Sequence, residues 1–193
     1  AQLFSKLDRL QSGDILVLAG SIPAALPADI YEQILKRLSK KGVYFVIDTS
    51  GESLMRTLDY RPFLIKPNHH ELGALFGTTI FSQEEALFHA KKLQKCGARN
   101  VLVSLAGMGA VLLDETGTTY QSEAPEGAVV NSVGAGDSMV AGFLAGYLKT
   151  HQYETAFYTG IAAGSATAFT EWLAEKNEIM ALLNKMKPNN SYI

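Results

Sequence analysis

The sequence predicts an α/β protein in which a mostly parallel sheet is flanked by helices. Two features support this prediction: short, almost wholly apolar runs typical of buried parallel strands, and amphipathic segments of helical periodicity between them. This alternation predicts strands joined by right-handed helical crossovers. The chain has 193 residues, of which 47% are hydrophobic, so we expect a single domain over residues 1–193.

The first half of the chain shows the alternation most clearly. Buried strands are predicted at 14–20, 43–48, 63–67 and 100–104. Helices are predicted at 1–10, 27–41, 49–58, 70–76 and 82–97. Ser82-Gln-Glu-Glu85 is a capping-box start, and Gly42 and Gly77 are expected to end the helices that precede them.

The second half begins with a hairpin and continues into three helices. The hairpin is predicted to pair 109–114 with 118–121, and a short strand is predicted at 129–131. The helices are expected at 135–149, 153–170 and 175–186, followed by a short tail at 191–193. The first of the three is rich in small residues, and we expect it to pack closely through Gly142, Ala145 and Gly146.

Composition and charge exclude several classes of partner. The net charge is −2 and no basic run is long, so we expect no binding to nucleic acid or to an anionic membrane. No apolar run approaches the ~20 residues that span a bilayer. The single cysteine, Cys96, excludes an intrachain disulfide and is typical of a reducing compartment. We therefore predict a cytoplasmic protein.

A glycine turn at 131–138 is the most informative stretch. Gly134 and Gly136 let the backbone approach a ligand, and the helix that follows presents free N–H groups and the positive end of its dipole. Such a site binds anionic oxygen, above all phosphate. Asp137 would repel phosphate, which makes sense if it takes a proton from a nucleophile that attacks the phosphate. The alternative is that Asp137 only caps the helix.

Two further stretches follow predicted strands. Asn68 and Glu71 lie three residues apart on one helix face and could hold hydrated Mg²⁺; alternatively, they form a capping pair. Glycines in the segment 104–109 could pass close to a nucleotide or simply form a tight turn. The small-residue run 162–166 could be a platform for adenine or a close packing contact. Ligands of parallel sheets lie beyond the carboxyl ends of the strands, where Ser21 and these polar loops are expected to gather.

These residues carry a resemblance to a known family. Asn131-Ser-Val-Gly-Ala-Gly-Asp-Ser-Met-Val-Ala-Gly-Phe143 resembles the second signature of the ribokinase-like (PfkB) carbohydrate kinases, although Asp and Thr are common there in place of Asn131 and Ser132. Three more stretches match in the family's order: Leu-Ala-Gly-Ser21-Ile-Pro, Lys66-Pro-Asn-His-His-Glu-Leu and Ser104-Leu-Ala-Gly-Met-Gly-Ala. The first two are similar to the sugar-phosphate branch, which includes 1-phosphofructokinase and tagatose-6-phosphate kinase.

The resemblance implies a three-layer ribokinase-like fold and an activity. The activity is ATP- and Mg²⁺-dependent phosphorylation of a hydroxyl of fructose 1-phosphate or tagatose 6-phosphate to the bisphosphate. The implied roles are Asp137 as catalytic base; Gly134, Ala135 and Gly136 as anion hole; Ser104, Gly107, Gly109, Ala163 and Ser165 as nucleotide contacts; Ser21 as substrate contact; and Asn68 and Glu71 as metal ligands through water. A role for Lys66 is also implied.

The family's amino-terminal portion, with its sugar-binding motifs and its β lid, is not found in this sequence. The chain therefore resembles the carboxyl-terminal, nucleotide-binding part of such a kinase, which we expect to be inactive alone. The resemblance further implies a homodimer for the full-length protein. A non-catalytic nucleotide-binding fragment or regulatory relative is the alternative. A dinucleotide-binding domain is disfavoured because no Gly-x-Gly-x-x-Gly follows the first predicted strand.

Overall fold

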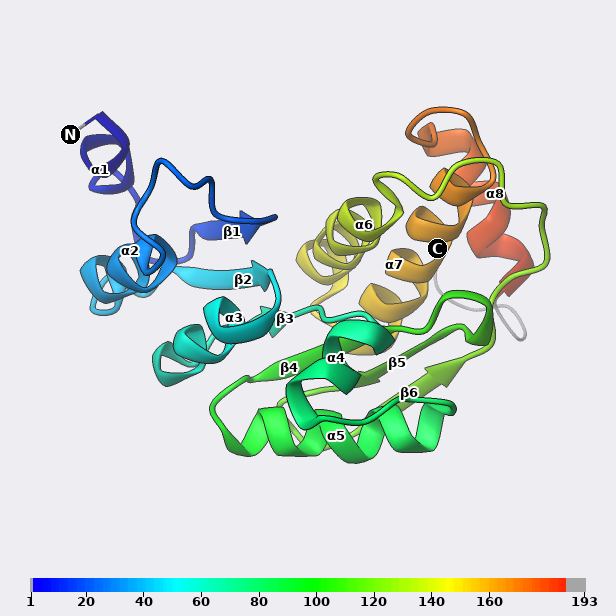
Figure 1. Ribbon diagram of the computed structural model, residues 1–193. Coiled ribbons are helices and arrows are strands. Elements are labelled where there is room, and N and C mark those ends of the chain that lie inside the picture. The colour runs from blue at the N-terminus through cyan, green and yellow to red at the C-terminus, as the bar shows by residue number, and fades with distance from the viewer. Residues whose placement is uncertain (1, 187–193) are drawn as a thin grey trace. The chain divides into compact units, whose positions relative to one another are not determined.

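Six strands form the sheet, in the order β1-β2-β3-β4-β5-β6 (Figure 1). The structure, a computed structural model, describes residues 2–186. The strands are β1 (Ile15–Ala19), β2 (Tyr44–Asp48), β3 (Leu64–Ile65), β4 (Asn100–Ser104), β5 (Ala110–Leu113) and β6 (Thr119–Ser122). The helices are α1 (Gln2–Leu7), α2 (Ile30–Leu38), α3 (Gly51–Thr57), α4 (His69–Phe76), α5 (Gln83–Lys95), α6 (Ala135–Thr150), α7 (Tyr153–Ala168) and α8 (Lys176–Met186), with 3₁₀ turns η1 (Leu58–Tyr60) and η2 (Ala106–Met108). The predicted alternation is confirmed, and the tail predicted at 191–193 lies outside the described residues.

The described residues fall into two compact units. The first unit comprises residues 2–103 and 112–119, and the second comprises 104–111 and 120–186. The organisation of residues 1–193 as a single domain stays a prediction. No helix within residues 2–186 has the length and apolar character needed to cross a membrane.

In the first unit, β1 to β4 pair in parallel, as the sequence predicts. Ala19 pairs with Asp48, and Ile47 pairs with Ile65, so β1, β2 and β3 end at the same edge of the sheet. The core of this unit is built from the side chains of β2, β3 and β4, many of which are fully buried. They include Val46, Ile47, Leu64, Ile65, Val101 and Leu102.

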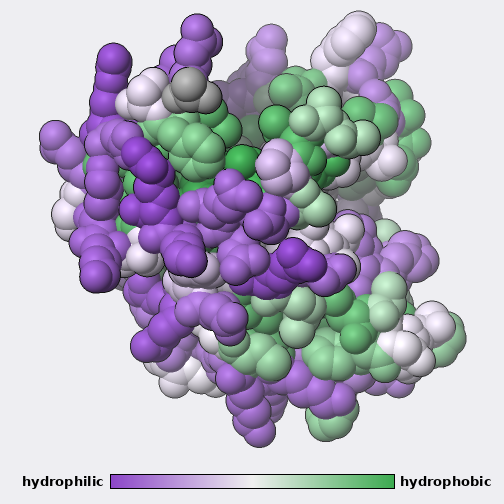
Figure 2. Space-filling view, turned by 60° about the vertical axis from the view of Figure 1, so that its left-hand side comes forward, coloured by the Kyte–Doolittle hydropathy of each residue, from purple (hydrophilic) through white to green (hydrophobic). Residues whose placement is uncertain are grey.

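The prediction that 14–20 forms a buried strand is wrong as to burial. β1 is the terminal strand of the sheet, and Leu18 is its one buried residue. Val17 is 43% exposed, and no described residue pairs with the outer edge of β1. Figure 2 shows one face of the molecule, on which hydrophilic and hydrophobic areas are mixed. An unpaired apolar edge of this kind is a template for further strand pairing.

Two helix boundaries in the first unit follow the predicted caps. α4 ends at Gly77, which adopts a left-handed conformation with φ of 64°. At the start of α5, the Ser82 hydroxyl accepts a hydrogen bond from the Glu85 N–H at 3.1 Å. The Glu85 carboxylate accepts from the N–H of Phe81 at 2.7 Å rather than from Ser82, so the predicted capping box is shifted by one residue.

The second unit is built around the helix pair α6 and α7, which run side by side (Figure 1). A Cβ atom at Gly142 would lie 2.6 Å from the Ala163 Cβ and from the Thr159 carbonyl oxygen. Gly146 is similarly close to α7, with Ala156 Cα at 2.9 Å. Close packing through these two glycines is confirmed. The same prediction for Ala145 is wrong, because that residue is exposed.

The strand predicted at 129–131 is also wrong. The N–H groups of Val130 and Asn131 both donate to the carbonyl oxygen of Ala168, at 2.8 and 3.2 Å. Two consecutive amides that share one acceptor at the end of α7 cannot belong to a strand ladder, in which successive amides point in opposite directions. Val129 and Val130 are 69% and 57% exposed, so the apolar pattern does not mark a core strand here.

Candidate active site

The glycine turn before α6 has a defined backbone geometry. Gly134 is the N-cap residue of α6, with φ of 80° and ψ of −7°. The Asn131 side-chain oxygen accepts from the Val133 N–H at 3.0 Å, and the Ser132 carbonyl accepts from the Ala135 N–H at 3.2 Å. The turn is therefore held by bonds within itself, and the left-handed conformation at Gly134 is one that glycine adopts without strain.

Three N–H groups at this turn are free to bind a ligand. Within residues 2–186, the amides of Gly134, Gly136 and Asp137 have no hydrogen-bond partner. The amide of Ala135, by contrast, is used by the turn. A helix N-terminus with free amides attracts anionic oxygen through both hydrogen bonding and the helix dipole. The geometry thus favours Gly134 and Gly136 as anion-hole donors over Ala135, and it adds the Asp137 N–H.

The carboxylate of Asp137 is exposed at the same turn. Asp137 is the third residue of α6, and no other described side chain pairs with it. The alternative in which Asp137 caps the helix is wrong, because Gly134 holds the N-cap position and no side chain caps α6. An unpaired acid among unpaired amides is suited to accepting a proton beside a bound phosphate.

In the first unit, two hydroxyl groups fix the backbone that precedes Ser21. The Tyr31 hydroxyl donates to the carbonyl oxygen of Ala19 at 2.8 Å, and the carbonyl oxygen of Gly20 is a second, more distant acceptor at 3.2 Å. The Thr49 hydroxyl donates to the same Gly20 oxygen at 3.1 Å. Burial, together with nearby Asp48, raises the pKa of Tyr31, so its phenol remains a donor at neutral pH. Ser21 is thus exposed at the end of a fixed backbone segment.

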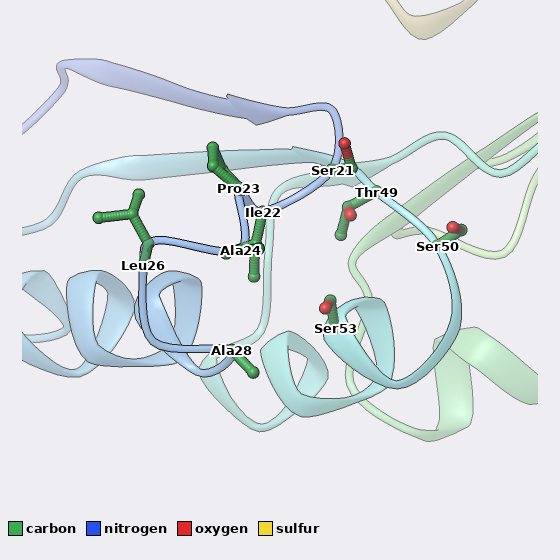
Figure 3. Close-up of a pocket in the computed structure, with 9 residues that line it drawn as sticks. All are labelled: Ser21, Ile22, Pro23, Ala24, Leu26, Ala28, Thr49, Ser50 and Ser53. Carbon is green, nitrogen blue, oxygen red and sulfur yellow. The ribbon is translucent and has the colours of Figure 1, made fainter.

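Ser21 also borders a cavity of about 370 Å³ (Figure 3). The lining comes from the loop after β1 and from the start of α3, and four of its residues carry hydroxyl groups. The lining residues are Ser21, Ile22, Pro23, Ala24, Leu26, Ala28, Thr49, Ser50 and Ser53. A neutral, hydroxyl-bearing wall of this kind can form hydrogen bonds to a polar ligand.

A buried ion pair joins the ends of β2 and β3. The Lys66 ammonium lies 3.1 Å from an Asp48 carboxylate oxygen, and the Lys66 side chain is only 6% exposed. The pairing follows from the parallel register, which places the residues after Ile47 and Ile65 next to each other. Removing Asp48 would take this partner from the buried Lys66 ammonium, so the pair helps to fix this edge of the sheet.

Asn68 and Glu71 form a complete capping box at the start of α4. The Asn68 Oδ1 atom accepts from the Glu71 N–H at 2.9 Å, and the Glu71 Oε2 atom accepts from the Asn68 N–H at 2.8 Å. The capping alternative is therefore confirmed. The capping bonds leave further oxygen lone pairs available: Oε1 of Glu71 and the second lone pair of Asn68 Oδ1 can still accept hydrogen bonds from water. These two oxygens fit a hydrated Mg²⁺ ion. No cluster of three metal-binding side chains occurs in the described part of the chain.

The segment after β4 forms a tight turn. The Leu105 N–H donates to the carbonyl of Gly109 at 2.8 Å, and a Cβ atom at Gly109 would lie only 1.9 Å from the Ser122 oxygen. Close backbone packing therefore explains this glycine. Gly107 has open space around it and is exposed, and Ser104 is half-buried. Of the three predicted nucleotide contacts in this turn, Gly107 is the most accessible.

The two predicted contacts on α7 are less accessible. Ala163 is 2% exposed and packs against Gly142, and Ser165 is half-buried. The small-residue run thus has a packing role in the helix pair, and its role at a nucleotide stays a prediction.

A comparison of the sequence with known families decides the affiliation. The profile of pfkB family carbohydrate kinases matches residues 1–179. The chain belongs to the pfkB family of carbohydrate kinases. The predicted family and its ribokinase-like α/β fold are thereby confirmed.

The following relatives within the pfkB family are sugar-phosphate kinases. The 1-phosphofructokinase of Bacillus subtilis (strain 168) is 51% identical over 178 residues, which are 92% of this chain and 58% of the relative. A D-tagatose-1-phosphate kinase of Bacillus licheniformis is 34% identical over 92% of this chain and 59% of the relative. The structure of phosphofructokinase-2 from Escherichia coli in complex with substrates and products has a TM-score of 0.89 at 29% identity, and covers 96% of this chain and 61% of that one. The chain thus spans less than two thirds of the length of these relatives.

In this pfkB-family chain, the predicted site residues divide between the two units. Four predicted residues lie in the first unit, namely Ser21, Lys66, Asn68 and Glu71, and the other predicted site residues lie in the second. Sequence reasoning missed two hydroxyl side chains: Tyr31, which bonds the backbone before Ser21, and Thr167, which donates to the Ser138 hydroxyl oxygen at 2.9 Å. Nothing in the helical pattern of α2 distinguishes Tyr31. Thr167 carried a signal, because it is a hydroxyl residue among the small apolar residues of α7.

Proposed function

We propose that the complete protein containing this chain is a sugar-phosphate kinase that transfers the γ-phosphoryl group of ATP to a free hydroxyl of fructose 1-phosphate. The observation that carries the proposal is the exposed, unpaired Asp137 beside the free amides at the start of α6. Substrate choice is supported by the B. subtilis 1-phosphofructokinase at 51% identity. A tagatose phosphate is the second candidate, supported by the D-tagatose-1-phosphate kinase at 34% identity.

The residues of the α6 turn account for the chemistry. The Asp137 carboxylate takes the proton of the attacking hydroxyl, a new O–P bond forms at the γ-phosphorus, and the bond to the bridging oxygen breaks to release ADP. The free amides of Gly134 and Gly136 donate to the phosphoryl oxygens as charge builds on them. Positioning and charge stabilisation of this kind supply most of the catalysis of phosphoryl transfer. Magnesium, when bound, neutralises phosphate charge, and Glu71 and Asn68 would hold its waters.

The direct test is an ADP-release assay on the full-length protein with ATP and Mg²⁺. Fructose 1-phosphate, fructose 6-phosphate, tagatose 1-phosphate and tagatose 6-phosphate are compared at equal concentrations. We expect the highest kcat/KM for fructose 1-phosphate. Absence of sugar-dependent ADP release with any of the four, from a protein that still binds ATP, would instead favour a non-catalytic nucleotide-binding relative. We also propose that the full-length protein is cytoplasmic, in keeping with the single, exposed Cys96. We propose that it is a homodimer on the family resemblance alone.

Tyr31→Phe is expected to weaken sugar-phosphate binding without slowing the chemical step. The substitution removes the hydroxyl that holds the backbone before Ser21. One such bond contributes about 1 kcal/mol, so we expect KM for the sugar phosphate to rise about fivefold. Steady-state kinetics with varied sugar phosphate measure this. Tyr60→Phe is the control, because its hydroxyl neighbours Glu32 and not this loop. Equal KM values for the two variants would remove Tyr31 from the role.

Glu71→Gln separates the two roles of Glu71. Glutamine can keep the capping box but lacks the negative charge. We expect thermal stability to change little, while the Mg²⁺ concentration for half-maximal activity rises about tenfold, as for other outer-sphere partners of a metal. Glu85→Gln is the matched control, because Glu85 also accepts a backbone N–H at the start of its helix, that of Phe81. A Mg²⁺ requirement unchanged in Glu71→Gln would leave Glu71 with the cap alone.

A further inference from the structure

The hydroxyl of Thr167 has an unusual partner. Threonine side chains in helices commonly donate to the carbonyl four residues earlier, as Thr159 does to Thr155 at 2.7 Å on the same helix. Thr167 is 1% exposed, and its hydroxyl instead donates across the helix pair to the Ser138 hydroxyl oxygen of α6 at 2.9 Å. A buried hydroxyl bond between two helices fixes their register more specifically than apolar contact does.

The bond ends next to the proposed base. Ser138 directly follows Asp137, and the Ser138 N–H donates to the Gly134 carbonyl at 2.8 Å. Ser138 is therefore bonded through its backbone to the glycine turn and through its side chain to α7. A displacement of Ser138 would move Asp137 and the free amides before it, because they belong to the same helical turn.

The same hydroxyl also holds the loop after α7. The Ala174 N–H donates to the Thr167 hydroxyl oxygen at 3.2 Å. The preceding residue, Leu173, lies against the glycine turn, since a Cβ atom at Gly134 would be 2.7 Å from its Cδ2 atom. One side chain thus links α7, the first turn of α6 and the loop that borders the glycine turn.

The packing around Thr167 leaves this turn little freedom on the side of α7. A Cβ atom at Gly164, one turn before Thr167, would lie 3.0 Å from the Ala135 carbonyl oxygen. One turn further back, Gly160 approaches the Met139 carbonyl oxygen equally closely, at 3.0 Å. The glycines set the distance between the helices, and Thr167 is the polar contact that sets their register.

We propose that Thr167 is a positioning residue, whose hydroxyl holds the first turn of α6 so that Asp137 and the free amides keep the geometry for phosphoryl transfer. This inference rests on the proposed kinase function. It predicts a defect in turnover rather than in substrate binding, because the Thr167 side chain is only 1% exposed. A displacement of about 1 Å in a catalytic group can cost about a hundredfold in rate, so even a partial loosening is measurable.

The test uses three variants of the full-length protein: Thr167→Val, Thr167→Ser and Thr159→Val. Valine keeps the shape of Thr167 but removes the hydroxyl. We expect kcat to fall at least about tenfold, while KM for ATP and KM for the sugar phosphate each change less than about twofold. Serine restores the hydroxyl and should recover most of kcat. Thr159→Val removes a hydroxyl from the same buried helix pair, so it should lower thermal stability to a similar extent without the loss of kcat. Equal kcat values for Thr167→Val and Thr159→Val would overturn the proposal.

Hydrogen–deuterium exchange separates this inference from the proposed function. Amide exchange in the α6 turn, residues 134–138, is measured by mass spectrometry without substrate. We expect the two hydrogen-bonded amides of this turn, those of Ala135 and Ser138, to exchange faster in Thr167→Val than in the wild type or in Thr159→Val. If the wild-type protein shows no sugar-dependent ADP release, the proposed function fails, and the exchange result alone decides whether Thr167 holds the turn. Unchanged exchange at 134–138 would refute the role of Thr167 whatever the activity.

Discussion

Asp137→Asn is expected to lower kcat of the full-length enzyme at least about a hundredfold, because a positioned general base contributes about 10²- to 10⁴-fold. Asparagine has nearly the same shape but cannot take the proton of the attacking hydroxyl. The Asp137 carboxylate makes no bond to the described residues, so its replacement should leave the fold unchanged. ATP affinity should stay the same or rise slightly, because a negative charge near the phosphates is removed. Single-turnover phosphoryl transfer and ATP titration measure the two quantities separately.

Glu171→Gln is the matched control for this substitution. Glu171 is an exposed acid in the same unit, and its backbone carbonyl accepts from the Asn131 side chain at 3.1 Å, so it borders the same turn. Its side chain has no part in the proposed chemistry. We expect kcat within about twofold of the wild type for Glu171→Gln. If Asp137→Asn retained comparable turnover, Asp137 would not be the general base, and another residue would have to take the proton of the attacking hydroxyl.

The parts of this structure that sequence reasoning predicted are those governed by local signals. The cap formed by Asn68 and Glu71, which was the alternative to metal binding, and the end of α4 at Gly77 each depend on bonds within a few residues, and the structure has both. The glycine turn is similarly local, since the left-handed conformation of Gly134 follows from the residue type. The position of Asp137 outside the cap could not be read in this way, because glycine and aspartate are both acceptable N-cap residues.

The parts that were not predicted depend on neighbours distant in sequence. An apolar run predicts a strand, but the exposure of Val17 depends on whether a further strand pairs with β1. Val129 and Val130 show the same ambiguity, since the amides of Val130 and Asn131 donate to the carbonyl oxygen of Ala168, which lies almost 40 residues later. The hydroxyl of Thr167 has both a local acceptor and a distant one available, and only the three-dimensional packing of α6 on α7 selects the distant one.

Gly134→Ala is expected to have the second large effect, on both stability and turnover. Gly134 has φ of 80°, a conformation that costs an L-residue roughly 1–2 kcal/mol. The added methyl group would also lie 2.7 Å from Leu173 Cδ2, a contact that rotation of that side chain can relieve. The remaining strain favours a flip of the turn to negative φ, which would redirect the free amides of Gly134 and Gly136. Loss of one such donor costs about 10²- to 10³-fold in kcat.

Two further variants separate backbone strain from the position of the amides. Gly117→Ala is the strain control, because Gly117 has φ of 90° with open space around it, in the turn between β5 and β6. It should lose about as much stability as Gly134→Ala, measured by thermal unfolding, but keep its kcat. Adding Leu173→Ala to Gly134→Ala should restore little activity, because the steric contact is not the main cost. Recovery of full turnover in that double variant would show that the side-chain contact, and not the left-handed backbone, makes glycine necessary at 134.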